Sequence, residues 1–192
     1  MVFSLILYAT AALVAVGVLL YCVGTYNEMV QSAREIDRSF ANLEVSLKQR
    51  HDEIPRLVEI CRGYMDHERA LLERVARSRS GFADATDVTS KVDSENGLNR
   101  ELKDLYARVE AYPALQADSL FQELSQRLTA LEDLISDRRE LFNSSVTAFN
   151  TLVQSFPALI VARPLGFRPR APLDLGPEMK KSAPSLAKAS NT

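Results

Sequence analysis

The most constraining feature of this 192-residue chain is an uncharged N-terminal run, because the first Asp, Glu, Lys or Arg is Glu28. Residues 2–23 are almost wholly apolar, and as a helix they would be about 33 Å long. A bilayer's hydrocarbon core is roughly 30 Å thick. We therefore predict a transmembrane anchor over residues 1–24, followed by a domain polar enough to be soluble.

A retained anchor is a better interpretation than a cleaved signal peptide. A signal peptide carries a positive n-region, a shorter apolar run and a small-x-small cleavage site, and the run ends instead in Leu20-Tyr21-Cys22-Val23-Gly24. The bulky Tyr21 before Cys22 also argues against lipidation. A buried core helix is the alternative, although an apolar run without a polar stripe would need a larger protein around it.

Basic residues near the anchor predict its orientation. Arg34 and Arg38 follow the span, whereas only the α-amine precedes it. The positive-inside tendency then favours a short N-terminus outside and the domain in the cytoplasm. We expect a single-pass protein of the bacterial inner membrane.

Beyond Asn27, apolar residues recur at alternating steps of three and four, which is typical of helices packed through coiled-coil-like seams. The first seam runs from Met29 through Ile36 and Leu43 to Leu47, and the last from Phe121 to Phe156. We predict an all-α fold in which the anchor is followed by an antiparallel four-helix bundle over residues 25–160. The expected helices cover residues 26–53, 55–80, 91–112 and 119–156.

Helix breaks are predicted at four places. Pro55 separates the first two helices at a turn that contains His51, with a kink in one continuous helix as the alternative. Ser80-Gly81 and the polar run 84–90 end the second helix, and Pro113 ends the third. Ser119 and Gln122 suggest a capping box for the fourth, and Pro157 stops it.

The C-terminal segment, residues 161–192, differs in composition from the bundle. It is rich in proline, and from Arg163 onward it holds six basic residues against Asp174 and Glu178. Its net charge is +4, so that residues 24–162 carry −6 within a chain of −2. A basic, proline-rich segment of this kind is expected to be disordered. It either has no partner or contacts anionic lipid headgroups of the bilayer.

Catalytic and metal-binding patterns are scarce, so we predict no enzyme, no cofactor and no metal site. Cys22 lies in the span and Cys61 at a core position, so they cannot form a disulfide or a shared metal site. His67 has no ligating neighbour one turn away, and we expect a partly buried, hydrogen-bonded side chain there. The Glu-x-x-His motif of di-iron bundles is missing. The acidic domain, which has no basic face with aromatic residues, disfavours nucleic-acid binding.

Several stretches together resemble the LemA family of bacterial membrane proteins. They are residues 50–59 (RHDEIPRLVE), 63–68 (GYMDHE), 109–115 (VEAYPAL) and 165–170 (LGFRPR), with Tyr26-Asn27 after the anchor. The departures are mild: Arg56 stands where Asn is expected, and Phe142 and Phe149 replace tyrosines of Tyr-Asn pairs.

The resemblance implies an N-terminal anchor, four long antiparallel helices and no known catalytic residues, without defining a biochemical role. We therefore expect a non-enzymatic interaction or adaptor protein that presents a helical bundle beside the bilayer. Its expected partner is another membrane protein or a membrane-bound protease. Alternatives are a self-assembling homo-oligomeric membrane scaffold and, less favoured, a metal- or small-molecule-binding bundle that includes His67.

Overall fold

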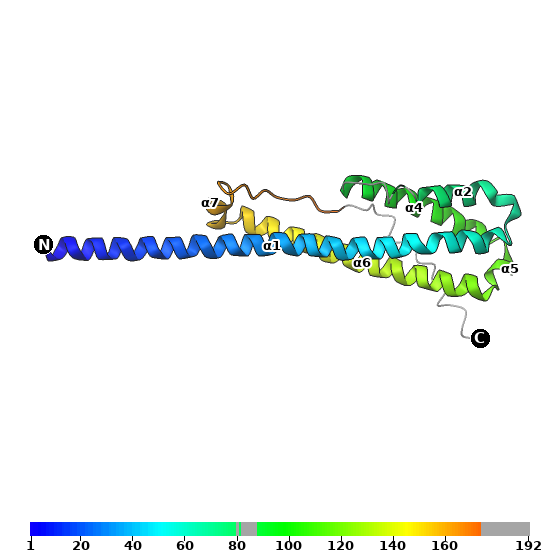
Figure 1. Cartoon of the computed structure of the whole chain (residues 1–192), viewed down its shortest axis with the longest axis horizontal. Helices are drawn as coiled ribbons and strands as arrows, with labels where there is room; N and C mark the ends of the chain where they lie inside the picture. The colour runs from blue at the N-terminus through cyan, green and yellow to red at the C-terminus, as the bar shows by residue number, and fades with distance from the viewer. Residues whose placement is uncertain (80, 82–87, 174–192) are drawn as a thin grey trace. The chain divides into compact units, whose positions relative to one another are not determined.

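The structure is a computed structural model that describes residues 1–79, 81 and 88–173 (Figure 1). It is all-α in this part of the chain: α1 (Val2–Arg62), the 3-10 turn η1 (Asp66–Glu68), α2 (Arg69–Ser78), α4 (Val88–Val109), α5 (Pro113–Gln116), α6 (Ser119–Gln154) and α7 (Ala158–Ala162). The chain divides into two compact units. Of the described residues, unit 1 comprises 1–41 and 140–172, and unit 2 comprises those within 42–139 together with Leu173.

The apolar run forms the start of α1, and its side chains from Val2 to Val23 are mostly exposed. Its most apolar window has a mean hydropathy of 2.4, is not buried at all against the rest of the chain, and qualifies by length and composition as a membrane span. Burial begins at Thr25 and Met29, where α1 enters the packed part of unit 1.

Unit 2 is a four-helix bundle made of α1 from residue 42 onward, α2, α4 and α6 up to residue 139. One apolar cluster joins all four helices. Its fully buried members include Leu57 and Cys61 on α1, Val75 on α2, Leu105 on α4 and Leu124 on α6. These residues follow the predicted three-and-four spacing, and the predicted all-α bundle is confirmed.

The predicted break at Pro55 is wrong, because α1 continues through this residue to Arg62. A proline lacks an N–H, so the carbonyl of His51 loses its usual helical partner. Instead, Arg79 Nε donates a hydrogen bond to the backbone carbonyl oxygen of His51 at 3.0 Å. The turn instead lies at Gly63–Met65, just before η1.

Other helix ends also differ from the prediction. The third helix, α4, begins at Val88, within the segment expected to be a loop, whereas residues 84–87 lie outside the described part. Asp118, not Ser119, caps α6: its Oδ1 accepts the backbone N–H groups of Leu120 and Phe121 at 2.8 and 3.0 Å. The helix ends at Gln154, so Phe156 is not part of the buried stripe and is highly exposed.

Unit 1 is held by what we call the aromatic clasp, defined as Tyr26, Phe149 and Phe167. The ring of Phe167 lies 6.0 Å from that of Tyr26 on α1 and 6.4 Å from that of Phe149 on α6. Arg170 adds to it, with its guanidinium 5.7 Å from the centre of the Phe149 ring. Aromatic pairs at these distances are favourable beyond the area that they bury.

The expectation of disorder from residue 161 onward is wrong for residues 161–172. The backbone N–H of Arg170 donates to Asn150 Oδ1, and Asn150 Nδ2 donates to the carbonyl of Arg170, both at 2.8 Å. Arg170 also pairs with Asp37 at 2.7 Å. Two hydrogen bonds between the Asn150 side chain and the Arg170 backbone, together with the ion pair to Asp37, therefore hold this segment on α6 and α1. Residues 174–192 lie outside the described residues.

Candidate functional site

The interior of unit 2 contains a group of polar side chains among its apolar residues. We call it the buried charge cluster, defined as Arg50, His51, Glu95 and Asn99. Arg50 and Glu95 are fully buried and His51 nearly so. Arg50 donates through Nη2 to Glu95 Oε2 and through Nη1 to Asn99 Oδ1, the latter at 2.9 Å. His51 Nε2 lies 2.5 Å from the other carboxylate oxygen, Glu95 Oε1.

Helical register explains why these charges lie inside the bundle. Arg50 lies three residues after the buried Leu47 and four before the buried Ile54, which is a seam position of α1. Glu95 lies three residues before Leu98, at the corresponding seam position of α4. Both side chains must therefore point into the core, where each satisfies the other's charge.

Neighbouring groups have pKa values that reflect the same low-dielectric interior. Burial raises the pKa of Glu132, an effect that the positive charge of Arg50 partly offsets. Burial also raises the pKa of Tyr106, and the charge of Glu132 adds to this effect. Burial raises the pKa of Cys61 to about 12, so its thiol stays protonated at neutral pH and is a poor nucleophile.

The charged groups of the cluster are buried and engaged with one another across two helices. The carboxylate of Glu95 already meets a guanidinium and an imidazole, and both of its partners are shut away from solvent. Across residues 1–79, 81 and 88–173, no group of three His, Cys, Asp or Glu side chains is placed to hold a metal ion. What the cluster can do is fix α1 against α4 in one register.

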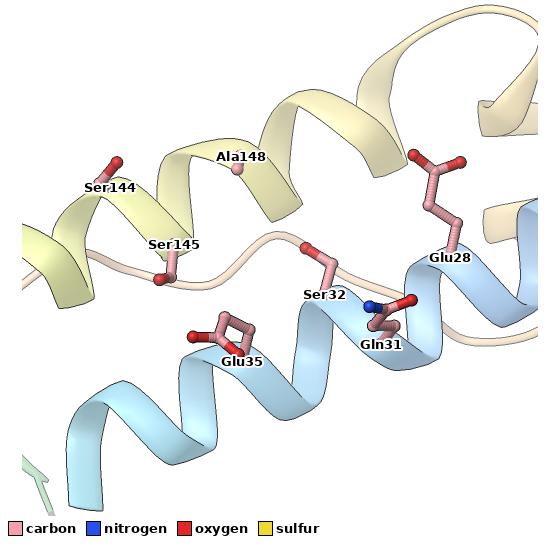
Figure 2. Close-up of a pocket in the computed structure, with 7 residues that line it drawn as sticks. All are labelled: Glu28, Gln31, Ser32, Glu35, Ser144, Ser145 and Ala148. Atoms are coloured by element: carbon pink, nitrogen blue, oxygen red, sulfur yellow. The ribbon is translucent and has the colours of Figure 1, made fainter. Parts of the chain in front are cut away.

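Unit 1 has an open groove of about 610 Å³ between α1 and α6. Figure 2 shows that Glu28, Ser32 and Glu35 line it from α1, and Ser144, Ser145 and Ala148 from α6. Six of the seven lining residues are polar, and two of them, Glu28 and Glu35, are acidic. Within the described part of the chain, no three His, Cys, Asp or Glu side chains are placed to hold a metal ion. The groove is therefore a polar, acidic surface of unit 1.

Two sequence-level expectations about single residues are corrected here. His51 is part of α1 and buried, not in a turn, because α1 does not break at Pro55. His67 is exposed in η1 rather than partly buried, because the chain turns at Gly63–Met65 and takes it off the helical seam.

Sequence reasoning missed the buried charge cluster, although a signal for it existed. Arg50 and Glu95 are charged residues at seam positions of otherwise apolar stripes, and such positions predict buried, paired charges. That these two residues face each other required the fold, because 45 residues separate them.

The chain is similar in sequence to a known family and to several curated proteins. The sequence model of the LemA family matches residues 39–187. The chain is 26% identical over 144 residues to the protein LemA of Metamycoplasma hominis, an alignment that covers 74% of this chain and 66% of that protein. It is 21% identical over 169 residues to the magnetosome protein MamQ of Magnetospirillum gryphiswaldense, covering 74% of this chain and 62% of the relative.

The magnetosome protein MamQ 2 of Paramagnetospirillum magneticum shows the same identity and coverage. The chain therefore spans slightly less than two thirds of the length of each of these curated relatives. None of their names describes an enzyme.

Proposed function

This chain belongs to the LemA family, and we propose that it is a membrane-anchored, non-enzymatic interaction module that presents its helical bundle to protein partners beside the bilayer. The observation that carries the proposal is the continuity of α1. One helix, Val2–Arg62, contains both the exposed apolar span and a buried face of the packed domain. Such a helix restricts where the domain can lie relative to the bilayer. Tethering raises the effective concentration of a weak membrane partner.

The closed interior supports a role without catalysis. The side chains whose chemistry would suit an active site, His51 and Glu95, are buried and engaged with each other and with Arg50. Cys61 is buried with a raised pKa. A substrate in solution has no access to these groups, so surface recognition is the function that the geometry favours.

The turns of unit 2 around residues 63–68 and 109–118 are the surface that we assign to the partner. Two of the stretches that carry the family resemblance, 63–68 and 109–115, meet here, since Met65, Val109 and Leu115 belong to one buried cluster. Tyr64 donates its hydroxyl to Asp118 Oδ2 at 2.7 Å, which ties the first turn to the start of α6. His67 and Leu120 are exposed beside them. The proposed partner is another membrane protein or a membrane-bound protease.

Orientation is part of the same proposal. Arg34 and Arg38 on α1, and the exposed Arg163 and Arg168 farther along the chain, all follow the span. Basic residues on this side favour a cytoplasmic domain at the inner membrane. Cysteine-reactive labelling of intact cells at an exposed residue of α6 measures the orientation, and rapid labelling by a membrane-impermeant reagent would contradict it.

Site-specific photo-crosslinking in native membranes tests the partner surface. A photo-reactive amino acid replaces Leu120 in the full chain, and the matched control carries it at Ala130, an exposed position on the same helix. The proposal expects one discrete crosslinked protein from the first position and none from the second. Capture of only a second copy of the chain would favour a self-assembling scaffold, and no crosslink at Leu120 would overturn the assignment.

A further inference from the structure

Three large apolar side chains of unit 1 are exposed just beyond α6. Phe156 is 81% exposed, Ile160 on α7 is 64% exposed and Leu165 is 53% exposed. We call these three residues the apolar rim. Ala158 and Ala162 of α7 are buried, and Phe167 contacts Tyr26 on α1 and Phe149 on α6. The exposure of the three apolar side chains therefore does not come from an unfolded segment.

The contacts of Phe167 place the apolar rim next to the end of the membrane span. Tyr26 lies three residues beyond Val23, or about 4.5 Å along the helix axis, and its ring contacts Phe167. The backbone N–H of Phe167 donates to the carbonyl of Ala162, the last residue of α7, at 3.1 Å. Within unit 1, α7 therefore lies beside the part of α1 that leaves the apolar run (Figure 1).

The segment that contains the apolar rim carries charge of one sign. Every charged residue between positions 141 and 173 is an arginine, namely Arg163, Arg168 and Arg170. An acidic residue next to this segment is Glu28 on α1, two residues after Tyr26. Arg170 is engaged with Asp37, but Arg163 and Arg168 are exposed. An apolar edge flanked by arginines is the composition of segments that lie in the headgroup region of a bilayer.

We propose that α7 and the turn 163–168 form a second membrane contact, in which the apolar rim enters the headgroup boundary of the bilayer that α1 spans. Arg163 and Arg168 then lie over anionic phospholipid phosphates. The bilayer is the chosen occupant because the aromatic clasp makes this surface continuous with the span, and because the charges are complementary. The contact would fix the angle between the domain and the membrane, which the anchor alone does not.

The chain has no tryptophan, so a single Phe156→Trp substitution provides a clean depth reporter in the full chain. The variant is reconstituted in vesicles of phosphatidylcholine and phosphatidylglycerol whose acyl chains carry bromine, a contact quencher. Leu141→Trp is the matched control, since Leu141 is 63% exposed on α6 and about 20 Å along the helix from its end at Gln154. We expect strong quenching and blue-shifted emission for Phe156→Trp, and solvent-like emission for Leu141→Trp.

Equal, weak quenching of the two reporters would overturn the proposal. If Phe156→Trp does not fold, as judged by its helical circular dichroism, Ile160→Trp takes its place. Adding Arg163→Gln or Arg168→Gln should lower the ratio of docked to undocked domain about fivefold each in the anionic vesicles. Quenching that is the same in pure phosphatidylcholine would overturn the role of the arginines. Crosslinking at Leu120 is an independent readout, so failure here does not imply failure of the partner surface.

Discussion

Units 1 and 2 are built on the same two long helices, but they bury different chemistry. In unit 2 the seam position of α1 between Leu47 and Ile54 is Arg50, which meets Glu95 in the core. In unit 1 the seam residues of α1 are Met29 and Ile36, and the ion pair Arg170–Asp37 lies at the surface. Apolar side chains can pack against one another in several alignments of two helices. A buried charge is stable only in the alignment that places an oppositely charged partner beside it. The charged core therefore specifies alignment in unit 2, and the aromatic clasp supplies packing in unit 1.

The largest expected effect comes from breaking the buried pair. Glu95→Ala leaves Arg50 charged and unpaired in the core, so we expect the free energy of unfolding to fall by about 3–5 kcal/mol. The matched change in unit 1, Asp37→Ala, removes an exposed partner of Arg170 and should cost at most about 1 kcal/mol. Urea unfolding of the full chain in detergent micelles, followed by circular dichroism, measures both.

The double variant Arg50→Met with Glu95→Leu separates lost charge from lost packing. Because it removes both charges and keeps side-chain volume, part of the stability should return. The remaining loss reflects His51 and Asn99, which no longer have Glu95 and Arg50 as hydrogen-bond partners. Similar losses for Glu95→Ala and Asp37→Ala would contradict the difference between the two units.

Phe149→Ala should produce the next largest loss. Phe149 is almost fully buried and contacts both Phe167 and Arg170, so we expect a loss of about 3 kcal/mol. A double-mutant cycle with Phe167→Ala isolates the aromatic pair, with an expected coupling of about 1 kcal/mol. If the losses of the two single variants add up to the loss of the double variant, the rings of Phe149 and Phe167 do not stabilise each other.

Glu132→Gln should stabilise the protein at neutral pH. Burial raises the pKa of Glu132 above its usual 4.5 in the folded state. The protonated Glu132 side chain therefore makes its full contribution to folding stability below pH 4.5. This contribution is lost as the pH rises through the pKa that Glu132 has in the folded state. We expect the urea midpoints of wild type and variant to agree at low pH and to favour the variant at pH 7. A variant that is less stable at pH 7 would show that ionised Glu132 supports Arg50.

Asp118→Asn should produce the smallest effect, with the opposite dependence on pH. The hydroxyl of Tyr64 and then the backbone N–H of Phe121 lower the pKa of Asp118 below its usual 3.8. Its contribution is present above pH 3.8 and is lost as the pH falls through the folded pKa. The variant should be slightly less stable at pH 7 and equal to wild type in acid, with Tyr64→Phe reducing the difference. A difference that persists in acid would contradict the ionic origin.

Much of the fold was predictable because it depends on local periodicity. The apolar run, the all-α class and the four seams follow from residue spacing alone, and buried residues such as Leu57, Leu105 and Leu124 confirm the seams. The charges at Arg50 and Glu95 were visible as exceptions in those seams. Their pairing was not predictable, since seam position indicates burial but not the partner.

The predictions of a break at Pro55 and of disorder in residues 161–172 were wrong because contacts with residues far away in the sequence decide these two segments. Pro55 normally ends a helix, and only Arg79 on another element supplies the lost hydrogen bond to His51. The proline-rich residues from 163 onward have the composition of a disordered segment. Asn150, Asp37 and Phe149 nevertheless hold Arg170 in place. These partner residues lie on other helices, so the sequence around Pro55 or Arg170 alone does not reveal them.

The amino-acid sequence by itself determined the uncharged apolar run, the helical class and the faces that must be buried, because each depends on side chains within one or two helical turns. The tertiary structure alone decided that α1 passes through Pro55, that Arg50 meets Glu95, and that Phe167 brings α7 beside the end of the apolar run. Each of these depends on groups tens of residues apart, whose interaction exists only once the helices pack.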